Sequence, residues 1–124
     1  MYDDGAMHRL PKETDLSFLL GKTVEQVCLG QFQTQVHLNA ASISIEGKHA
    51  LILAEENREI VWERSAFPAD GISKLLGQTL SRVSVIEDGT IDLSFSSGDR
   101  LLVFDDSDQY ESYQITCGSL TIIV

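Results

Sequence analysis

The chain has 124 residues, of which 43% are hydrophobic and 23% are charged, and its formal net charge is −10. This length and composition predict one folded domain with a real core and exclude a disordered chain. Apolar runs such as residues 50–54 are far shorter than the roughly 20 residues that cross a bilayer, so we expect no membrane contact. The strong negative charge repels phosphate backbones, so we expect no nucleic acid partner.

Residues 1–14 are expected to form a flexible N-terminal extension. The first five residues are acidic and contain no apolar stretch, which argues against a secretory signal. The two cysteines, Cys28 and Cys117, stand in no motif. Without a signal they favour reduced thiols over a disulfide, although the sequence leaves that pairing open. We therefore expect a cytoplasmic protein.

One segment occurs twice in the chain. Residues 16–24 (LSFLLGKTV) return 56 positions later as residues 72–80 (ISKLLGQTL). An internal repeat of this kind indicates a fold made of two similar halves. We expect one domain over residues 15–124 that consists of two repeats, at about 16–62 and 72–124.

Each half is predicted to contain a short helix, a β-meander and a hairpin. The helices end at Gly21 and Gly77. Alternation of apolar and polar residues then predicts about ten short strands. We expect a mainly β protein, α+β at the margin, packed as a two-sheet sandwich or a flattened barrel. The positions predicted to be buried are Val27, Leu29, Val36, Leu38, Ile43, Ile45, Val83, Val85, Ile91, Leu93 and Phe95.

The spacing at the start of each meander carries a further prediction. Val24 and Val27 are three residues apart, and so are Leu80 and Val83, which breaks the period of two. A bulge or a helix-to-strand transition would account for both. The offset between the halves also grows from 56 to about 58, which predicts one extra residue in each turn of the second meander.

The most distinctive stretch is acidic and contains tyrosines. Residues 87–124 hold eight acids and one base, a net charge of −7. Tyrosines beside acids suit an interface with a basic protein, whereas a solvated acidic loop is the plainer interpretation. The acid spacing does not match a helix-loop-helix calcium site, so we expect no metal. The candidate binding residues are Asp105, Asp106, Asp108, Tyr110, Glu111 and Tyr113.

No catalytic residue and no cofactor are expected. The chain lacks a nucleophile elbow and a phosphate-binding loop. His8, His37 and His49 are not spaced as zinc ligands, and His37 should point away from the core because it lies between two apolar residues. Trp62 is expected to serve packing. The alternative is a small-ligand-binding module or minor enzyme, a hydrolase or isomerase, with its site between the halves.

Five segments together resemble a family of small uncharacterised bacterial proteins, which is classed only as a domain of unknown function. The resemblance covers about residues 15–124 and implies a bacterial cytosolic protein, without an activity, a cofactor or a catalytic residue. By analogy with small acidic immunity proteins, we expect a binding protein that neutralises a basic partner, in an oligomeric state that stays open. The segments are 19–30 (LLGKTVEQVCLG), 42–47 (SISIEG), 75–80 (LLGQTL), 88–95 (DGTIDLSF) and 105–115 (DDSDQYESYQI).

Overall fold

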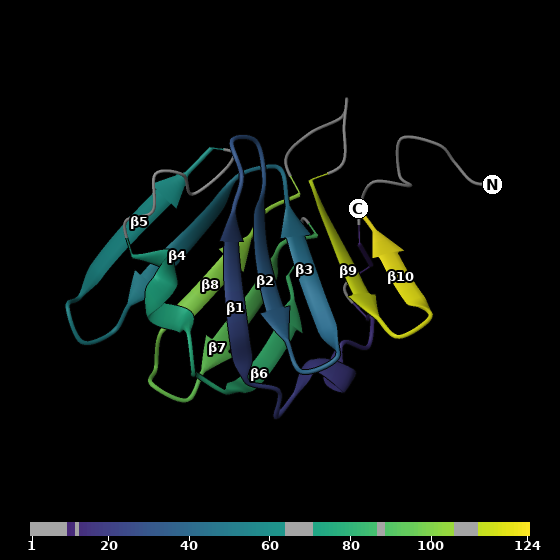
Figure 1. Cartoon of the computed structure of the whole chain (residues 1–124), viewed down its shortest axis with the longest axis horizontal. Coiled ribbons are helices and arrows are strands. Elements are labelled where there is room, and N and C mark those ends of the chain that lie inside the picture. The colour runs from purple at the N-terminus through teal and green to yellow at the C-terminus, as the bar shows by residue number, and fades with distance from the viewer. Residues whose placement is uncertain (1–9, 12, 64–70, 87–88, 106–111) are drawn as a thin grey trace.

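The computed structural model describes residues 10–11, 13–63, 71–86, 89–105 and 112–124. These residues form ten strands and two short 3-10 helices, so the prediction of a mainly β protein is confirmed (Figure 1). The helices are η2 (Ser17–Leu19) and η3 (Ile72–Leu75). The strands are β1 (Val24–Leu29), β2 (Thr34–Leu38), β3 (Ala41–Ile45), β4 (His49–Leu53), β5 (Arg58–Trp62), β6 (Leu80–Val85), β7 (Ile91–Phe95), β8 (Arg100–Val103), β9 (Tyr113–Cys117) and β10 (Leu120–Ile123).

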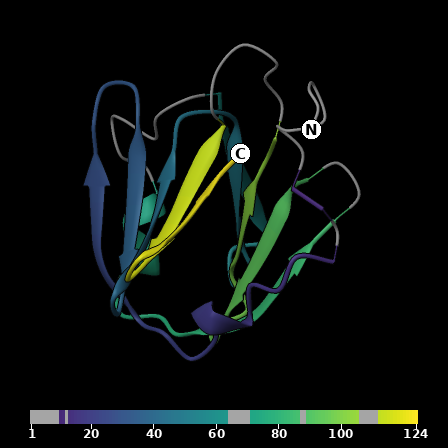
Figure 2. The ribbon, with the colours of Figure 1, turned by 90° about the vertical axis from the view of Figure 1, so that its right-hand side faces the viewer.

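The strands form two antiparallel sheets of five, and each sheet contains strands of both halves. The first sheet has the order β1-β2-β3-β9-β10 and the second has the order β5-β4-β8-β7-β6. The hairpin of each half therefore joins the meander of the other half. The strand order is the same in both sheets, which fits two similar halves, but the exchange of hairpins was not predicted. The sheets stack as a sandwich, and Figure 2 shows the blue and yellow strands in one layer and the green strands in the other.

The two copies of the repeated segment pair with each other at the seam between the sheets. Thr23 and Thr79 form an antiparallel bridge, and their Oγ1 atoms lie 3.1 Å apart. Because every bond of this seam has a counterpart 56 residues away, the seam marks an approximate twofold axis. Its four backbone hydrogen bonds, each 2.9 Å long, are Gly21 N–H to Leu80 O, Gly77 N–H to Val24 O, Val24 N–H to Gln78 O and Leu80 N–H to Lys22 O.

The irregular spacing at the start of each meander corresponds to a register shift. The pairing of β1 with β2 shifts between Val24 and Gln26, and the pairing of β6 with β7 shifts between Leu80 and Arg82. Each shift is a bulge or a similar irregularity of the strand pairing, at the position where the spacing predicted a bulge or a helix-to-strand transition. The offset between equivalent paired residues rises from 56 to 57 and then to 58 along the two meanders, so each turn of the second meander holds one extra residue, as expected.

The apolar faces of the sheets meet in one core. Eight of the eleven residues predicted to be buried are buried, and the three exceptions are Val27, Leu29 and Val83. These three lie on the outermost strands β1 and β6, which have a neighbour on one side only, and still pack against the core. Leu10 is also buried, at 7% exposure, although it lies before the predicted start of the domain at residue 15.

Leu93→Ala should lower the free energy of unfolding by about 2–5 kcal/mol, because it leaves a cavity in a closed core. Leu93 is 1% exposed on the central part of β7. Urea titration of both variants measures the loss, with the outward-facing Ser94→Ala as the control. Equal midpoints for the two variants would show that the inward and outward faces of β7 are assigned wrongly.

Gly21→Ala and Gly77→Ala should each cost about 1–2 kcal/mol, because both glycines have a positive φ that an L side chain rarely adopts. The φ angles are 81° and 82°, and an added Cβ would have no heavy atom within 4 Å at either site. The cost is therefore one of backbone conformation and should be equal at the two positions. Chemical unfolding of the two variants measures it, and clearly unequal costs would contradict the equivalence of the two copies.

Candidate functional site

Two of the six candidate binding residues belong to the core rather than to the surface. Tyr113 is 1% exposed and its hydroxyl donates a 2.7 Å hydrogen bond to the carbonyl oxygen of Gly89. Asp105 is 6% exposed. In the conformation described here, neither side chain is accessible to a protein partner. The tyrosine occupies an inward position of β9, where it pairs with Ile45 of β3.

Asp105 is held against the turn that joins β6 to β7. A Cβ added to Gly89 would lie 2.8 Å from Oδ2 of Asp105, and Gly89 has a φ of 87°. Only glycine fits there, because both the close approach and the positive φ exclude a side chain. Asp105 and Tyr113 thus anchor the two ends of the acidic stretch. The other candidates, Asp106, Asp108, Tyr110 and Glu111, lie outside the described residues, so their role in binding stays a prediction.

The outermost strands of the sheets differ in how they are protected against pairing with another chain. Strands at a sheet edge usually carry charges that discourage such pairing. Glu25 provides one on β1, Arg82 on β6, and Arg58 and Glu59 on β5. β10 contains only Leu, Thr, Ile and Ile, and Leu120 and Ile123 are 46% and 52% exposed. Among the described strands, β10 is therefore the uncharged edge.

The backbone of β10 is oriented for strand addition. Val124 donates a hydrogen bond to Tyr113 and accepts one from it, which fixes the alternation along the β9–β10 pair. Antiparallel pairs alternate between hydrogen-bonded and non-hydrogen-bonded positions. Thr121 and Ile123 consequently direct their N–H and C=O groups away from β9. No strand of the described part of the chain pairs with this side of β10.

The outer face of the first sheet is polar and carries a shallow groove of about 350 Å³. His37 lies in this groove, opposite the core as predicted, and its Nε2 is 3.2 Å from Oε1 of Gln35. The Ser42 and Thr116 hydroxyls, 2.7 Å apart, lie beside it. These hydroxyl and amide groups can bind a polar ligand weakly. Ser42 lies opposite His37 across β2 and β3, and its hydroxyl has the Thr116 hydroxyl as a hydrogen-bond partner.

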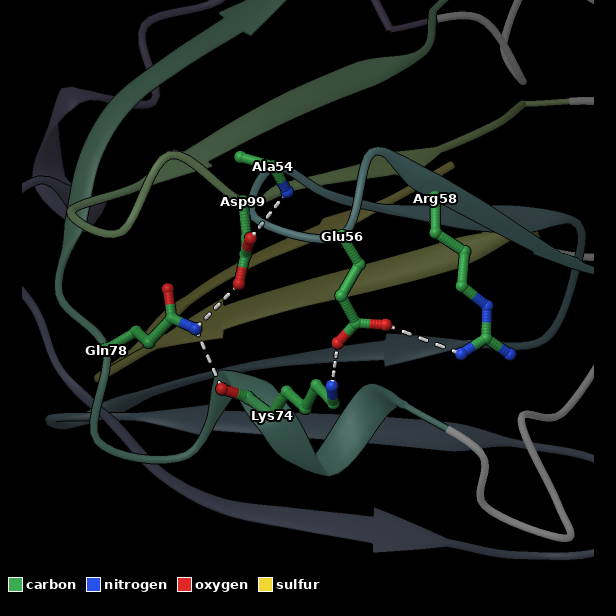
Figure 3. A network of polar contacts seen from close by, with 6 residues as sticks. All are labelled: Ala54, Glu56, Arg58, Lys74, Gln78 and Asp99. Carbon is green, nitrogen blue, oxygen red and sulfur yellow. Dashed lines mark hydrogen bonds and ion pairs between the residues drawn. The ribbon is translucent and has the colours of Figure 1, made fainter.

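A polar network ties η3 to the neighbouring turns (Figure 3). The Gln78 side-chain amide donates to Oδ2 of Asp99 at 3.0 Å and to the carbonyl oxygen of Lys74 at 2.7 Å. Oδ1 of Asp99 accepts from the backbone N–H of Ala54 at 2.9 Å. Burial raises the pKa of Asp99, but hydrogen bonds from Gln78, Ala54 and Ser97 outweigh it, so the net pKa is lowered. Both oxygens of this carboxylate accept hydrogen bonds, so Asp99 has a structural role.

Glu56 extends the same network at the surface. Its carboxylate forms an ion pair with Lys74 of η3 and lies 3.6 Å from Nη1 of Arg58. The hydrogen bond from Lys74 lowers the pKa of Glu56. Exposed ion pairs of this kind contribute little to stability. The network therefore positions the turn after β4 and offers no unsatisfied group for chemistry.

His49 is a fully buried titratable residue in the core. Its Nδ1 lies 3.0 Å from the carbonyl oxygen of Gly47, and its Nε2 is enclosed without a hydrogen-bond partner. The ring stacks at 5.2 Å on Trp62, which packs against the core as expected. Burial lowers the pKa of His49. The residue is therefore neutral at neutral pH.

Cys28 and Cys117 are free thiols on opposite faces of the first sheet, since Cys28 pairs with the outward Gln35 and Cys117 with the inward Ala41. In the described ranges, no group of three His, Cys, Asp or Glu residues could hold a metal ion. The same residues contain no helix that is long and apolar enough to span a membrane.

The free energy of unfolding should fall as the pH drops from about 7.5 to about 5.5. Because the pKa of His49 is lower in the folded state, the unfolded chain binds more protons below about pH 6.5, and the stability present above that pH is lost. Urea titrations should show a weaker pH dependence in His49→Phe, which keeps the ring contact with Trp62. Parallel pH profiles for wild type and His49→Phe would contradict this role.

One family model matches the chain. Its description is a family of unknown function, DUF6188, and the match spans residues 15–124. No curated protein and no solved structure matches the chain. The match includes both copies of the repeated segment and all ten strands. The chain belongs to DUF6188, a family of unknown function.

Proposed function

We propose that this protein acts by binding a basic protein partner, in the manner of an immunity protein, and that β10 is the edge on which an extended segment of the partner docks. The observation that carries the proposal is the uncharged strand β10, whose residues Thr121 and Ile123 direct backbone N–H and C=O groups away from β9. Strand addition to a sheet edge supplies affinity through main-chain hydrogen bonds. The net charge of −10 selects a partner of opposite sign.

The contact surface on β10 combines backbone and apolar groups. Thr121 and Ile123 offer N–H and C=O groups, while the exposed side chains of Leu120 and Ile123 offer apolar area. Residues 106–111, which precede Ser112 and β9 in the sequence, contain three acids and no base. Acidic residues at the rim of an interface mainly increase the association rate, whereas buried backbone and apolar contacts mainly slow dissociation.

The alternative, a ligand site or enzyme site between the two halves, has less support. The seam between the halves is occupied by the Thr23–Thr79 pair and its backbone hydrogen bonds. Two grooves of the described surface lie on the outer faces of the sheets, one on each sheet. No observation specific to a substrate favours this alternative.

Thr121→Pro should abolish capture of the partner, because proline removes the N–H that points away from β9 and leaves the β9–β10 ladder intact. The measurement is an affinity pull-down from host lysate with identification of the captured proteins. Thr121→Val, which keeps the N–H, is the matched control and should capture the same basic protein as wild type. Equal capture by both variants would rule out β10, and capture of an acidic protein would rule out the charge argument.

Reversing two acids, with Asp106→Lys and Asp108→Lys together, should slow association with the captured protein and weaken its salt dependence. Surface-plasmon measurements over a range of salt concentrations separate this effect on association from one on dissociation. A change confined to the dissociation rate would show that these acids make close contacts rather than steer the encounter.

A further inference from the structure

The outer face of the second sheet is apolar where β5, β4 and β8 lie side by side (Figure 1). Ala50 and Leu102 pair across β4 and β8, and Val61 pairs with Ala50 from β5. Ala50 is fully buried and lies outside the core cluster, on the outward position between His49 and Leu51. Val61 is 47% exposed, and Ile52 and Leu102 are half-buried. We call Ala50, Ile52, Val61 and Leu102 the outer apolar stripe.

At three of its four positions the fold does not require this stripe, whereas Val61 has the apolar Ile123 as its counterpart on the first sheet. The equivalent strands of the first sheet place Ser44, Gln114 and Thr116 where the second sheet has Leu102, Ala50 and Ile52. Both sheets bury their inner faces against the same core, and an antiparallel sheet normally presents a polar outer face. A contiguous apolar stripe on an outer face marks an interaction surface.

Charges of both signs lie around the stripe, although the chain as a whole carries −10. Arg100 forms an ion pair with Asp92 at 2.7 Å on the β8 side. Glu59 lies on the β5 side, opposite Ile52. Two copies of so acidic a chain repel each other least where acids and bases cancel. This face therefore fits a second copy of the chain better than it fits a basic partner.

We propose that the outer apolar stripe is a homodimer interface in which two second sheets stack face to face. A twofold axis that runs parallel to the strands near β4 places Val61 of one copy on Leu102 of the second copy. The same operation places Glu59 opposite Arg100 of the second copy. A guanidinium carries five N–H donors, and Asp92 takes those on Nε and Nη2. The interface is isologous, as in most soluble homodimers.

The first test is the mass of the protein in solution, measured by sedimentation velocity up to the highest soluble concentration. Wild type should reach twice the monomer mass of 13.7 kDa. Leu102→Glu should weaken the dimer about tenfold or more, because it places a charge at the centre of the stripe. Ser44→Glu, the equivalent position on the first sheet, should leave the dimer unchanged. A wild type that stays monomeric throughout, or equal effects of the two variants, would overturn the proposal.

The second test asks whether reversing the charge of Glu59 tightens or weakens the dimer. Glu59→Lys replaces a negative charge with a positive one and so makes the net charge of each chain less negative by two; nonspecific repulsion would fall and the dimer would tighten. Loss of the Glu59–Arg100 contact between the copies should instead weaken the dimer several-fold. Thr121→Lys, at the equivalent position of the first sheet, is the control and should not weaken it. A tighter Glu59→Lys dimer, or weakening by Thr121→Lys, would show that the copies meet elsewhere.

Discussion

The pairing of the two repeated segments at Thr23 and Thr79 is the constraint on which the rest of the structure depends. It joins the starts of β1 and β6, the first strands of the two meanders, and thereby holds both sheets at one end of the sandwich. Each meander then exposes its third strand as an edge. The hairpin of the opposite half fills that edge, so neither half can form its sheet alone. Each sheet therefore contains strands of both halves.

The segment that joins β3 to β4 shows how the two halves exchange their hairpins. The chain leaves β3 at Ile45 and begins β4 at His49, so three residues carry it from the first sheet to the second. The N–H groups of Glu46 and Gly47 both donate to the carbonyl oxygen of Ser112, at 2.9 and 3.0 Å. Ser112 immediately precedes β9, which takes the edge of β3 that β4 leaves open.

The sequence predicted the positions of the strands well but not the order of the strands in each sheet, and the difference has a physical reason. Alternation with period two is local, so it predicted about ten strands, and the breaks in it located both register shifts and the extra residue in each turn of the second meander. Strand order depends on which edge each hairpin covers, and Leu51 of β4 and Ile115 of β9 offer the same inward apolar contact to either meander. Edge status follows from strand order. The uncharged β10 edge and the outer apolar stripe were therefore invisible before the sheets were assembled.

The buried positions of the candidates Asp105 and Tyr113 were not predicted, for a similar reason. Tyr113 alternates with Ile115 on the inward face of β9, and this alternation was present in the sequence. The interpretation as an interface gave more weight to the acidic composition around the tyrosine. At the matching position of the second sheet, His49 pairs with Val103 as Tyr113 pairs with Ile45. Since the core accepts both rings, the residue type at this position carries little information on function. Differences between the outer faces of the two sheets carry more.

The β10 edge and the stripe lie in different sheets, so occupying one leaves the other accessible. A dimer through the stripe would present two β10 edges, and linked edges bind a multivalent partner more tightly without any new contact.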